Sequence, residues 1–377
     1  MADVKEDIRW MRLALELAAR GLGAVEPNPM VGCVLVRDGQ QIGQGWHKKF
    51  GDLHAEASAL KVCKNPKGAT AYVTLEPCSH TGKTPPCADA LIKAGIERVV
   101  VGSRDPNPQV AGSGIGRLEA AGIKVDTGVC GAQADAIIAP FAKWITTKLP
   151  WVIAKWAMSK NGKISTPPGA SPWISNEQSR AVVHDIRRRV DAILVGIGTV
   201  LTDDPLLTAR PAGSRKLTRV VLDSDARTPL DSKLVESLKE VKELSPVLIC
   251  VGAAAESSSV ENLRESGCEV LVLDSHDRYE QLVQVMNTLG SRSVTNLLVE
   301  GGSKILATFL EQLWVDEVHC FISPNEIDDN TDCLVSAPFT ASNPTKLAAK
   351  IGLGDYEIKD LSGDTYLYGR TSALRRF

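Results

Sequence analysis

Apolar and polar residues alternate along the first 130 residues in a pattern that predicts helices and strands in turn. The segment 7–20 begins with an acidic residue and places Ile8, Met11 and Leu15 at the spacing of an amphipathic helix. The stretches 31–36 and 41–46 flank Asp38-Gly39, a pair typical of a hairpin turn, and together they predict a β-hairpin. Further helices are expected near 54–64 and 86–94, and strands at 71–75, 97–102 and 123–125. This order predicts an αβα sandwich around a mixed sheet.

A second alternation of strands and helices follows residue 150. The segment from Phe141 to Pro150 carries few structure-specific signals, so we place a boundary there, with domains at 1–149 and 150–377. Strands are expected at 151–157, 192–197, 218–223, 246–251, 269–273, 295–300 and 317–323. Helices are expected at 176–189, 278–290 and 302–313, a turn at Asn161-Gly162, and a loop or helix start at 253–259. The second domain is therefore also α/β.

Composition limits the classes of protein to which the chain can belong, but it does not indicate which reaction the chain catalyses. The chain of 377 residues is 44% hydrophobic and 23% charged, which suits two domains with ordinary cores. A formal net charge of −2 does not indicate the excess of basic residues that is typical of nucleic-acid-binding proteins. Nine cysteines, an odd number, do not suit a disulfide framework and fit a reducing compartment. No secretory signal pattern and no apolar run of about 18 residues is found, so we expect a cytoplasmic chain without a membrane partner.

A histidine, a glutamate and two cysteines in the first domain carry the strongest chemical signal. His54 and Glu56 stand two residues apart at the start of a predicted helix, while Cys78 follows a predicted strand and Cys87 precedes a helix. As zinc ligands, His54, Cys78 and Cys87 would leave the fourth tetrahedral position open for water. Glu56 would move protons to and from that water. Helix N-termini favour thiolates. The set predicts a zinc site that activates water for deamination.

Glycine-rich turns give a weaker signal. Residues 299–303, Val-Glu-Gly-Gly-Ser, follow an apolar strand and open a helix, where glycines let a phosphate approach the helix N-terminus. A tight turn without a ligand fits the same residues. The clusters 112–116 and 196–198 lack the strand–turn–helix context of a dinucleotide fingerprint, and we interpret both as turns.

Several stretches of the first 145 residues resemble one enzyme family. Eight residues separate Cys78 from Cys87, more than in the generic deaminase signature. The stretch 74–87, TLEPCSHTGKTPPC, together with 27–32, His47 and 105–112, resembles the deaminase half of the bifunctional riboflavin-biosynthesis deaminase–reductase family. The resemblance implies a cytidine-deaminase-like domain that deaminates a diaminopyrimidinone ribonucleotide 5′-phosphate. It implies substrate contacts at Asn28, His47, His80 and Lys83, with Glu56 as the proton shuttle.

Residues 150–377 resemble the reductase half of the same family, whose fold is similar to dihydrofolate reductase; the matching stretches include 192–200 and 203–208. The resemblance implies NADPH as cofactor and hydride transfer to C1′ of the ribosyl group. It implies cofactor contacts at Ala157, Trp173, Thr199, Asp203, Ser224, Gly302 and Ser303. It implies substrate contacts at Ser171, Arg187, Leu207, Arg210 and Glu300. The two guanidinium groups suit a ribose phosphate. Lys155, Asp203 and Glu300 are the catalytic candidates.

Two stretches depart from the reductase pattern. The family usually reads S-L-D-G where this chain has Ser159-Lys160-Asn161-Gly162, and it carries P-x-x-x-G where this chain has the acidic segment 323–330. The alternative function is therefore a deaminase with a degenerate reductase domain.

Two further classes of protein could carry the same zinc motif: a cytidine or tRNA adenosine deaminase with an accessory domain, and a non-catalytic zinc-stabilised protein. The long insertion between Cys78 and Cys87 argues against the first class, and the presence of Glu56 argues against the second. We expect a small pyrimidine nucleotide as substrate, no nucleic-acid partner, and a homo-oligomer.

Overall fold

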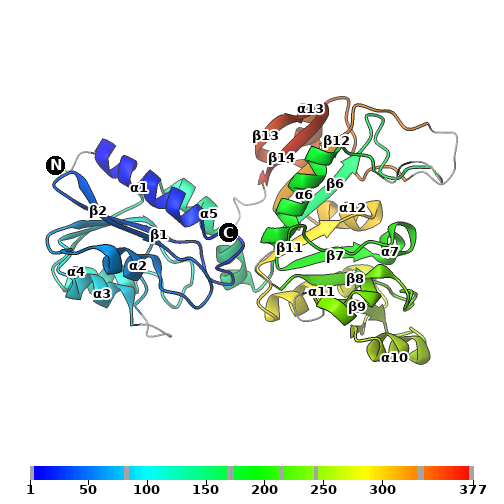
Figure 1. Cartoon of the computed structure of the whole chain (residues 1–377), viewed down its shortest axis with the longest axis horizontal. Coiled ribbons are helices and arrows are strands. Elements are labelled where there is room, and N and C mark those ends of the chain that lie inside the picture. The colour runs from blue at the N-terminus through cyan, green and yellow to red at the C-terminus, as the bar shows by residue number, and fades with distance from the viewer. Residues whose placement is uncertain are drawn as a thin grey trace. The chain divides into compact units, whose positions relative to one another are not determined.

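The chain forms two compact units, Met1–Lys148 and Leu149–Phe377 (Figure 1). The computed structural model describes residues 4–79, 85–167, 171, 173–212, 216–241, 245–328 and 335–372. Each unit has its own sheet and its own hydrophobic core. Within the described ranges, no helix has both the length and the apolar character needed to cross a bilayer.

The first unit is built on a five-stranded mixed sheet of order β2-β1-β3-β4-β5. Its strands are β1 (Gly32–Arg37), β2 (Gln40–Trp46), β3 (Thr70–Leu75), β4 (Arg98–Ser103) and β5 (Lys124–Thr127). β1 runs antiparallel to β2 and β3, and β4 runs parallel to β3 and β5. Asp38 and Gly39 have φ values of 50° and 70°, as a tight two-residue hairpin turn requires, so the predicted hairpin is confirmed.

Helices cover both faces of this sheet. They are α1 (Val4–Ala19), α2 (Ala55–Val62), α3 (Cys87–Lys93), α4 (Ser113–Ala120) and α5 (Gly131–Thr147). Alternate residues of β1 point to opposite faces: Val34 packs with α1 and α5, whereas Leu35 packs with α2, α3 and α4. The predicted αβα sandwich is confirmed.

One local prediction for the first unit is wrong. The cluster 112–116 is not a simple turn, because Gly112 precedes α4 and the following residues are helical. Residues 141–147, where the sequence carries few structure-specific signals, form the last part of α5 despite Pro140 inside the helix. Glycine and proline lower helix propensity locally, and packing against the sheet outweighs that preference in both helices.

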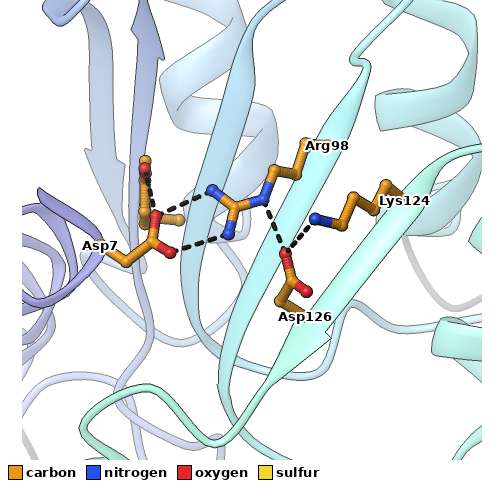
Figure 2. Close-up of polar contacts among 5 residues, drawn as sticks. Asp7, Arg98, Lys124 and Asp126 are labelled. Atoms are coloured by element: carbon orange, nitrogen blue, oxygen red, sulfur yellow. Dashed lines mark hydrogen bonds and ion pairs between the residues drawn. The ribbon is translucent and has the colours of Figure 1, made fainter. Parts of the chain in front are cut away.

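A partly buried ion pair joins α1 to the sheet (Figure 2). Both oxygens of Asp7 accept hydrogen bonds from Arg98 at 2.8 Å, and the Tyr72 hydroxyl donates to Asp7 at 2.8 Å. The Nε of Arg98 donates to Asp126 at 2.7 Å, and Lys124 lies 3.5 Å from the same carboxylate. The guanidinium of Arg98 holds the pKa of Asp7 below its ordinary value.

The second unit contains a nine-stranded sheet of order β10-β9-β8-β7-β11-β6-β12-β14-β13. Its strands are β6 (Trp151–Met158), β7 (Ala192–Gly196), β8 (Thr218–Leu222), β9 (Val247–Gly252), β10 (Glu269–Leu273), β11 (Asn296–Glu300), β12 (Glu317–Ile322), β13 (Leu353–Leu361) and β14 (Asp364–Thr371). All pairings from β10 through β12 are parallel, and β14 is antiparallel to β12 and β13. The seven predicted strands are confirmed, and the β13–β14 hairpin was not predicted.

The helices of the second unit are α6 (Glu177–Arg189), α7 (Ile197–Asp203), α8 (Lys233–Glu236), α9 (Leu238–Val241), α10 (Ser257–Glu265), α11 (Arg278–Ser291), α12 (Ser303–Glu311) and α13 (Pro344–Ile351). The expected helices 176–189, 278–290 and 302–313 correspond to α6, α11 and α12. The segment 253–259 leads into α10. The cluster 196–198 was interpreted as a turn, whereas only Gly196 precedes the helix and Gly198 lies inside α7.

The ion pair of Asp7 yields a stability prediction. Asp7→Asn should lower the free energy of unfolding by about 1–3 kcal/mol, because it removes a charged acceptor, whereas Tyr72→Phe should cost about 0.5–1.5 kcal/mol. Urea unfolding and hydrogen exchange of the α1 amides measure both losses. Because the folded pKa of Asp7 is depressed, its contribution is full above the unfolded pKa of about 3.9 and fades as pH falls through the folded value. Equal losses in the two variants would contradict this assignment.

Candidate functional site

Three predicted metal ligands meet at one end of the first sheet. His54 immediately precedes α2, Cys78 follows β3, and Cys87 is the first residue of α3. The Nδ1 of His54 lies 3.6 Å from the Cys78 Sγ and 3.4 Å from the Cys87 Sγ, and the three ligand atoms lie within 4.8 Å of one another. Tetrahedral zinc, with Zn–S of about 2.3 Å and Zn–N of about 2.0 Å, separates such ligands by roughly 3.6 Å. The donor set and its geometry therefore fit zinc.

The two cysteines are also held to each other. The backbone N–H of Cys87 donates to the Cys78 Sγ at 3.3 Å, and the N–H of Ala88 donates to the Cys78 carbonyl at 3.2 Å. Hydrogen bonding from Cys87 lowers the pKa of Cys78, and the same interaction together with burial raises the pKa of Cys87. One thiolate is thus already favoured, and metal binding must release the proton of the other.

Glu56 is the second residue of α2 and is only 3% exposed. Burial raises the pKa of Glu56 to about 7, and the negative charge of Cys78 adds to that rise. A carboxyl group that changes protonation near neutral pH is suited to accept and return a proton.

Asn28 and His47 lie beside this cluster. The Asn28 Nδ2 is 3.1 Å from the His47 Nε2, and the His47 Nδ1 is 3.1 Å from the carbonyl of Leu53. Because that carbonyl can only accept, Nδ1 of His47 carries the proton and Nε2 accepts from Asn28. The His47 ring stands edge-on to His54, with ring centroids 5.5 Å apart. His80 and Lys83, also predicted as substrate contacts, lie outside the described residues.

The cofactor candidates of the second unit gather at one edge of its sheet. The strands β8, β7, β11 and β6 are consecutive and parallel, so their C-terminal ends share an edge. The candidates at or just beyond those ends are Ser224 (β8), Thr199 and Asp203 (β7), Gly302 and Ser303 (β11), and Ala157 (β6). Open α/β sheets bind ligands at such an edge, near a switch in strand order.

Glycines shape the middle of this edge. Gly301 and Gly302 have φ values of 78° and 73°, which other residues adopt only with strain. A Cβ on Gly301 would lie 3.0 Å from the Thr199 Oγ1, so the turn after β11 approaches α7 closely. The segment before α6 carries two further candidates: Trp173 is 60% exposed, and its N–H donates to the Ser171 Oγ at 3.3 Å.

A buried ion pair occupies the same edge. Arg187 of α6 donates to both oxygens of Glu300 at 2.8 and 2.7 Å, and to the Thr208 carbonyl at 3.3 Å. Burial opposes ionisation of Glu300, but the charge of Arg187 outweighs it and lowers the pKa of Glu300 to about 2. The bidentate guanidinium that the sequence assigned to a phosphate is thus engaged by Glu300, whereas Arg210 is exposed.

Lys155 stands opposite Glu300 in the pairing of β6 with β11. Burial lowers the pKa of Lys155, with Glu300 acting against that shift. Burial also raises the pKa of Asp203, and Lys155 opposes this change. Leu207 is buried, with a φ of 54°. The structure therefore places Lys155, whose pKa is lowered, near the carboxylates of Glu300 and Asp203.

Sequence reasoning missed His184, which lies one helical turn before Arg187 on α6. Burial and the charges of Arg187 and Arg210 lower its pKa. Its Nδ1 is buried, with no hydrogen-bond partner within the part of the chain that the structure describes. The sequence did carry a signal: His184 and Arg187 are three residues apart in the predicted helix 176–189, so both side chains lie on the same face of that helix.

The two departures from the family's reductase pattern contact each other. The Asn161 side chain donates to the Ile327 carbonyl at 2.8 Å and accepts from the Ile327 N–H at 3.1 Å. The N–H of Lys160 donates to the Asn325 carbonyl at 2.9 Å. An ionised aspartate cannot donate to a carbonyl, so asparagine at 161 suits the segment that this chain carries after β12.

Comparison with known proteins decides the family. Residues 4–103 match the cytidine and deoxycytidylate deaminase zinc-binding region, and residues 150–329 match the RibD C-terminal domain. The riboflavin biosynthesis protein RibD of Actinobacillus pleuropneumoniae is 43% identical over 319 residues, covering 84% of each chain. The chain belongs to the RibD family. RibD of Escherichia coli is 37% identical over 337 residues, 88% of this chain and 92% of that one.

Solved RibD structures extend the agreement to the fold. RibD of Acinetobacter baumannii gives a TM-score of 0.80 at 34% identity and covers 98% of this chain and 100% of its own. A Thermotoga maritima deaminase/reductase gives 0.78 at 32%, covering 98% and 99%. The chain is a bifunctional deaminase and reductase of riboflavin biosynthesis that uses zinc and NADPH.

The ligand geometry makes a prediction about metal content. The purified protein should hold about one zinc ion per chain in its deaminase domain, and Cys78→Ala should lose it because two ligands cannot hold the ion in place. Elemental analysis after gel filtration measures both. Cys63→Ala serves as control, since Cys63 is a free, partly buried cysteine outside the cluster. Stoichiometric zinc in the Cys78 variant would overturn the ligand assignment.

Proposed function

We propose that this chain acts on the same substrates as its Thermotoga maritima relative, a diaminohydroxyphosphoribosylaminopyrimidine deaminase and 5-amino-6-(5-phosphoribosylamino)uracil reductase. The similarity to that relative extends over nearly the whole of both chains. Each unit also carries its own cluster of candidate residues: the metal ligands in the first, and the Arg187–Glu300 pair in the second. The first domain, 1–149, carries the deaminase reaction and the second, 150–377, carries the reduction.

In the deaminase centre, His54, Cys78 and Cys87 hold zinc, which when bound supplies an activated water. Glu56 takes a proton from the attacking water and returns protons to the ring nitrogen and the departing ammonia. Its burial and its position two residues after His54 support this role. Asn28 and His47, joined by a hydrogen bond, orient the pyrimidine with the help of His80 and Lys83.

In the reductase centre, NADPH supplies the hydride and the protein supplies position and a proton. Lys155 donates a proton to the ring oxygen, whose bond to C1′ is broken when the sugar opens and C1′ receives the hydride; its lowered pKa makes it a better acid than an ordinary lysine. Asp203 and Glu300 keep Lys155 charged before transfer. Ser171, Leu207 and Arg210 contact the substrate, while Ala157, Trp173, Thr199, Ser224, Gly302 and Ser303 contact the cofactor.

We also propose a homo-oligomer that works in the cytoplasm. β13 is an outermost strand whose Tyr356 and Ile358 are 39% and 43% exposed, and an edge strand of this kind pairs readily with a second copy. The thiolate ligand pair suits a reducing compartment. Sedimentation equilibrium of the purified chain tests the assembly, and a monomer at micromolar concentration would refute it.

The proton shuttle predicts the effect of one substitution. Glu56→Gln keeps the size of the side chain and removes its basicity, so deamination should slow by at least about 10²-fold. Zinc content should stay unchanged. Ammonia release from the diaminopyrimidine substrate measures the rate, with Glu16→Gln on the exposed side of α1 as control. A rate near that of the wild type would remove Glu56 from this role.

Substitutions in the deaminase centre and in the reductase centre should each impair only one of the two activities. With the deaminated substrate supplied, Glu56→Gln should oxidise NADPH at the wild-type rate, whereas Asp203→Ala should slow that oxidation while leaving ammonia release intact. Absorbance of NADPH follows the reaction, and Asp185→Asn on the outer face of α6 is the control. Wild-type reduction is measured first. Its absence would favour a degenerate reductase domain over the bifunctional assignment.

A further inference from the structure

Glu76 is a buried carboxylate that neither proposed reaction uses. It lies between the end of β3 and the zinc ligand Cys78, and only 4% of it is exposed. Its two oxygens accept four hydrogen bonds from backbone N–H groups. Oε2 accepts from Asp105 and Gly112 at 3.2 and 3.0 Å, and Oε1 accepts from Gly114 and Ile115 at 2.9 and 3.2 Å. Each oxygen thus has two backbone donors, so the buried side chain is fully hydrogen-bonded.

The four donors have two distinct places in the fold. Asp105 and Gly112 stand at the two ends of the loop that joins β4 to α4, so Oε2 closes that loop. Gly114 and Ile115 are the second and third residues of α4, whose N–H groups are those that a capping side chain normally satisfies. The residue at the cap position is Gly112, which has no side chain to do so. Glu76 therefore caps α4 from the segment that follows β3.

The first turn of α4 also contacts the residues on either side of Cys78. A Cβ on Gly114 would lie 1.9 Å from the Pro77 carbonyl oxygen, so the helix backbone rests directly on Pro77. The Ser79 hydroxyl lies 2.6 Å from the Ser113 hydroxyl, and Arg117 donates to the Ser79 carbonyl at 3.2 Å. Residues 76, 77 and 79 are therefore all fixed by α4, and Cys78 lies between them.

We propose that Glu76 is a positioning residue of the deaminase centre: its carboxylate joins the β4–α4 loop and the α4 cap to the segment that presents Cys78 to zinc. The proposal rests on the proposed ligand set. A ligand held in place before the metal arrives loses less freedom on binding, and residues behind metal ligands typically contribute about tenfold to hundredfold to metal affinity. Loop order and metal retention are then coupled through one side chain.

Glu76→Gln tests the coupling with little change in volume. Glutamine keeps one acceptor oxygen and turns the other into a donor, so two of the four N–H groups lose their acceptor. Zinc release to a chelator should become about tenfold to hundredfold faster. The visible spectrum of the cobalt-substituted protein should change because Cys78 is held less firmly. Amide exchange at Asp105, Gly112, Gly114 and Ile115 should quicken. Glu119→Gln, on the exposed face of α4, should match the wild type in all three measurements.

The outcomes separate the possibilities. Faster exchange with unchanged zinc release and cobalt spectrum would mean that Glu76 only caps α4, and would overturn the proposal, as would wild-type behaviour throughout. If Glu76→Gln does not fold, Arg117→Gln tests the second link between α4 and the Cys78 segment, because it removes the bond to Ser79. The same substitution removes the ion pair with Asp89 of α3, so Asp89→Asn is its control. Equal zinc release in these two variants would count against the proposal. Zinc retained by Cys78→Ala would instead refute the ligand set itself, whatever Glu76 does.

Discussion

Parallel pairing of the central strands decides where chemistry takes place in both units. Parallel strands bring their C-terminal ends to one edge, and the loops that leave that edge lie close together whatever their distance in sequence. In the first unit, the end of β3 delivers Cys78 beside the N-termini of α2 and α3. In the second, four consecutive strand ends carry the cofactor candidates. Each site therefore depends on the strand pairing of its own sheet.

Three buried glutamates show how surroundings assign different tasks to one side chain. Burial of Glu56, together with the charge of Cys78, outweighs the opposing charge of His54 and raises the pKa of Glu56 to about 7, which suits proton transfer. Glu300 is paired with Arg187, and its pKa falls to about 2, which suits a fixed charge. Glu76 is matched by four backbone dipoles and joins segments of chain. Burial is common to all three, and the partner decides the role.

Local spacing predicted the strands other than β13 and β14, the first-unit hairpin and the metal cluster, because each is encoded within a few neighbouring residues or in a short motif such as the one around Cys78. It did not predict α4, whose start at Gly112–Ile115 is stabilised by Glu76 from 36 to 39 residues away. The pairing of Arg187 with Glu300 joins residues 113 apart. Such partners become neighbours only through the sheet, so no window of sequence contains the signal.

Gly114 and Gly116 of α4 differ in whether a side chain can replace them. Any side chain at Gly114 would drive the helix away from the Pro77 carbonyl, whereas a Cβ at Gly116 meets no atom within 4 Å. Related chains that keep this active centre should therefore retain glycine at position 114. Position 116 should vary among them, although this chain has glycine at both positions. A designer who wished to stiffen α4 has room at the second glycine and none at the first.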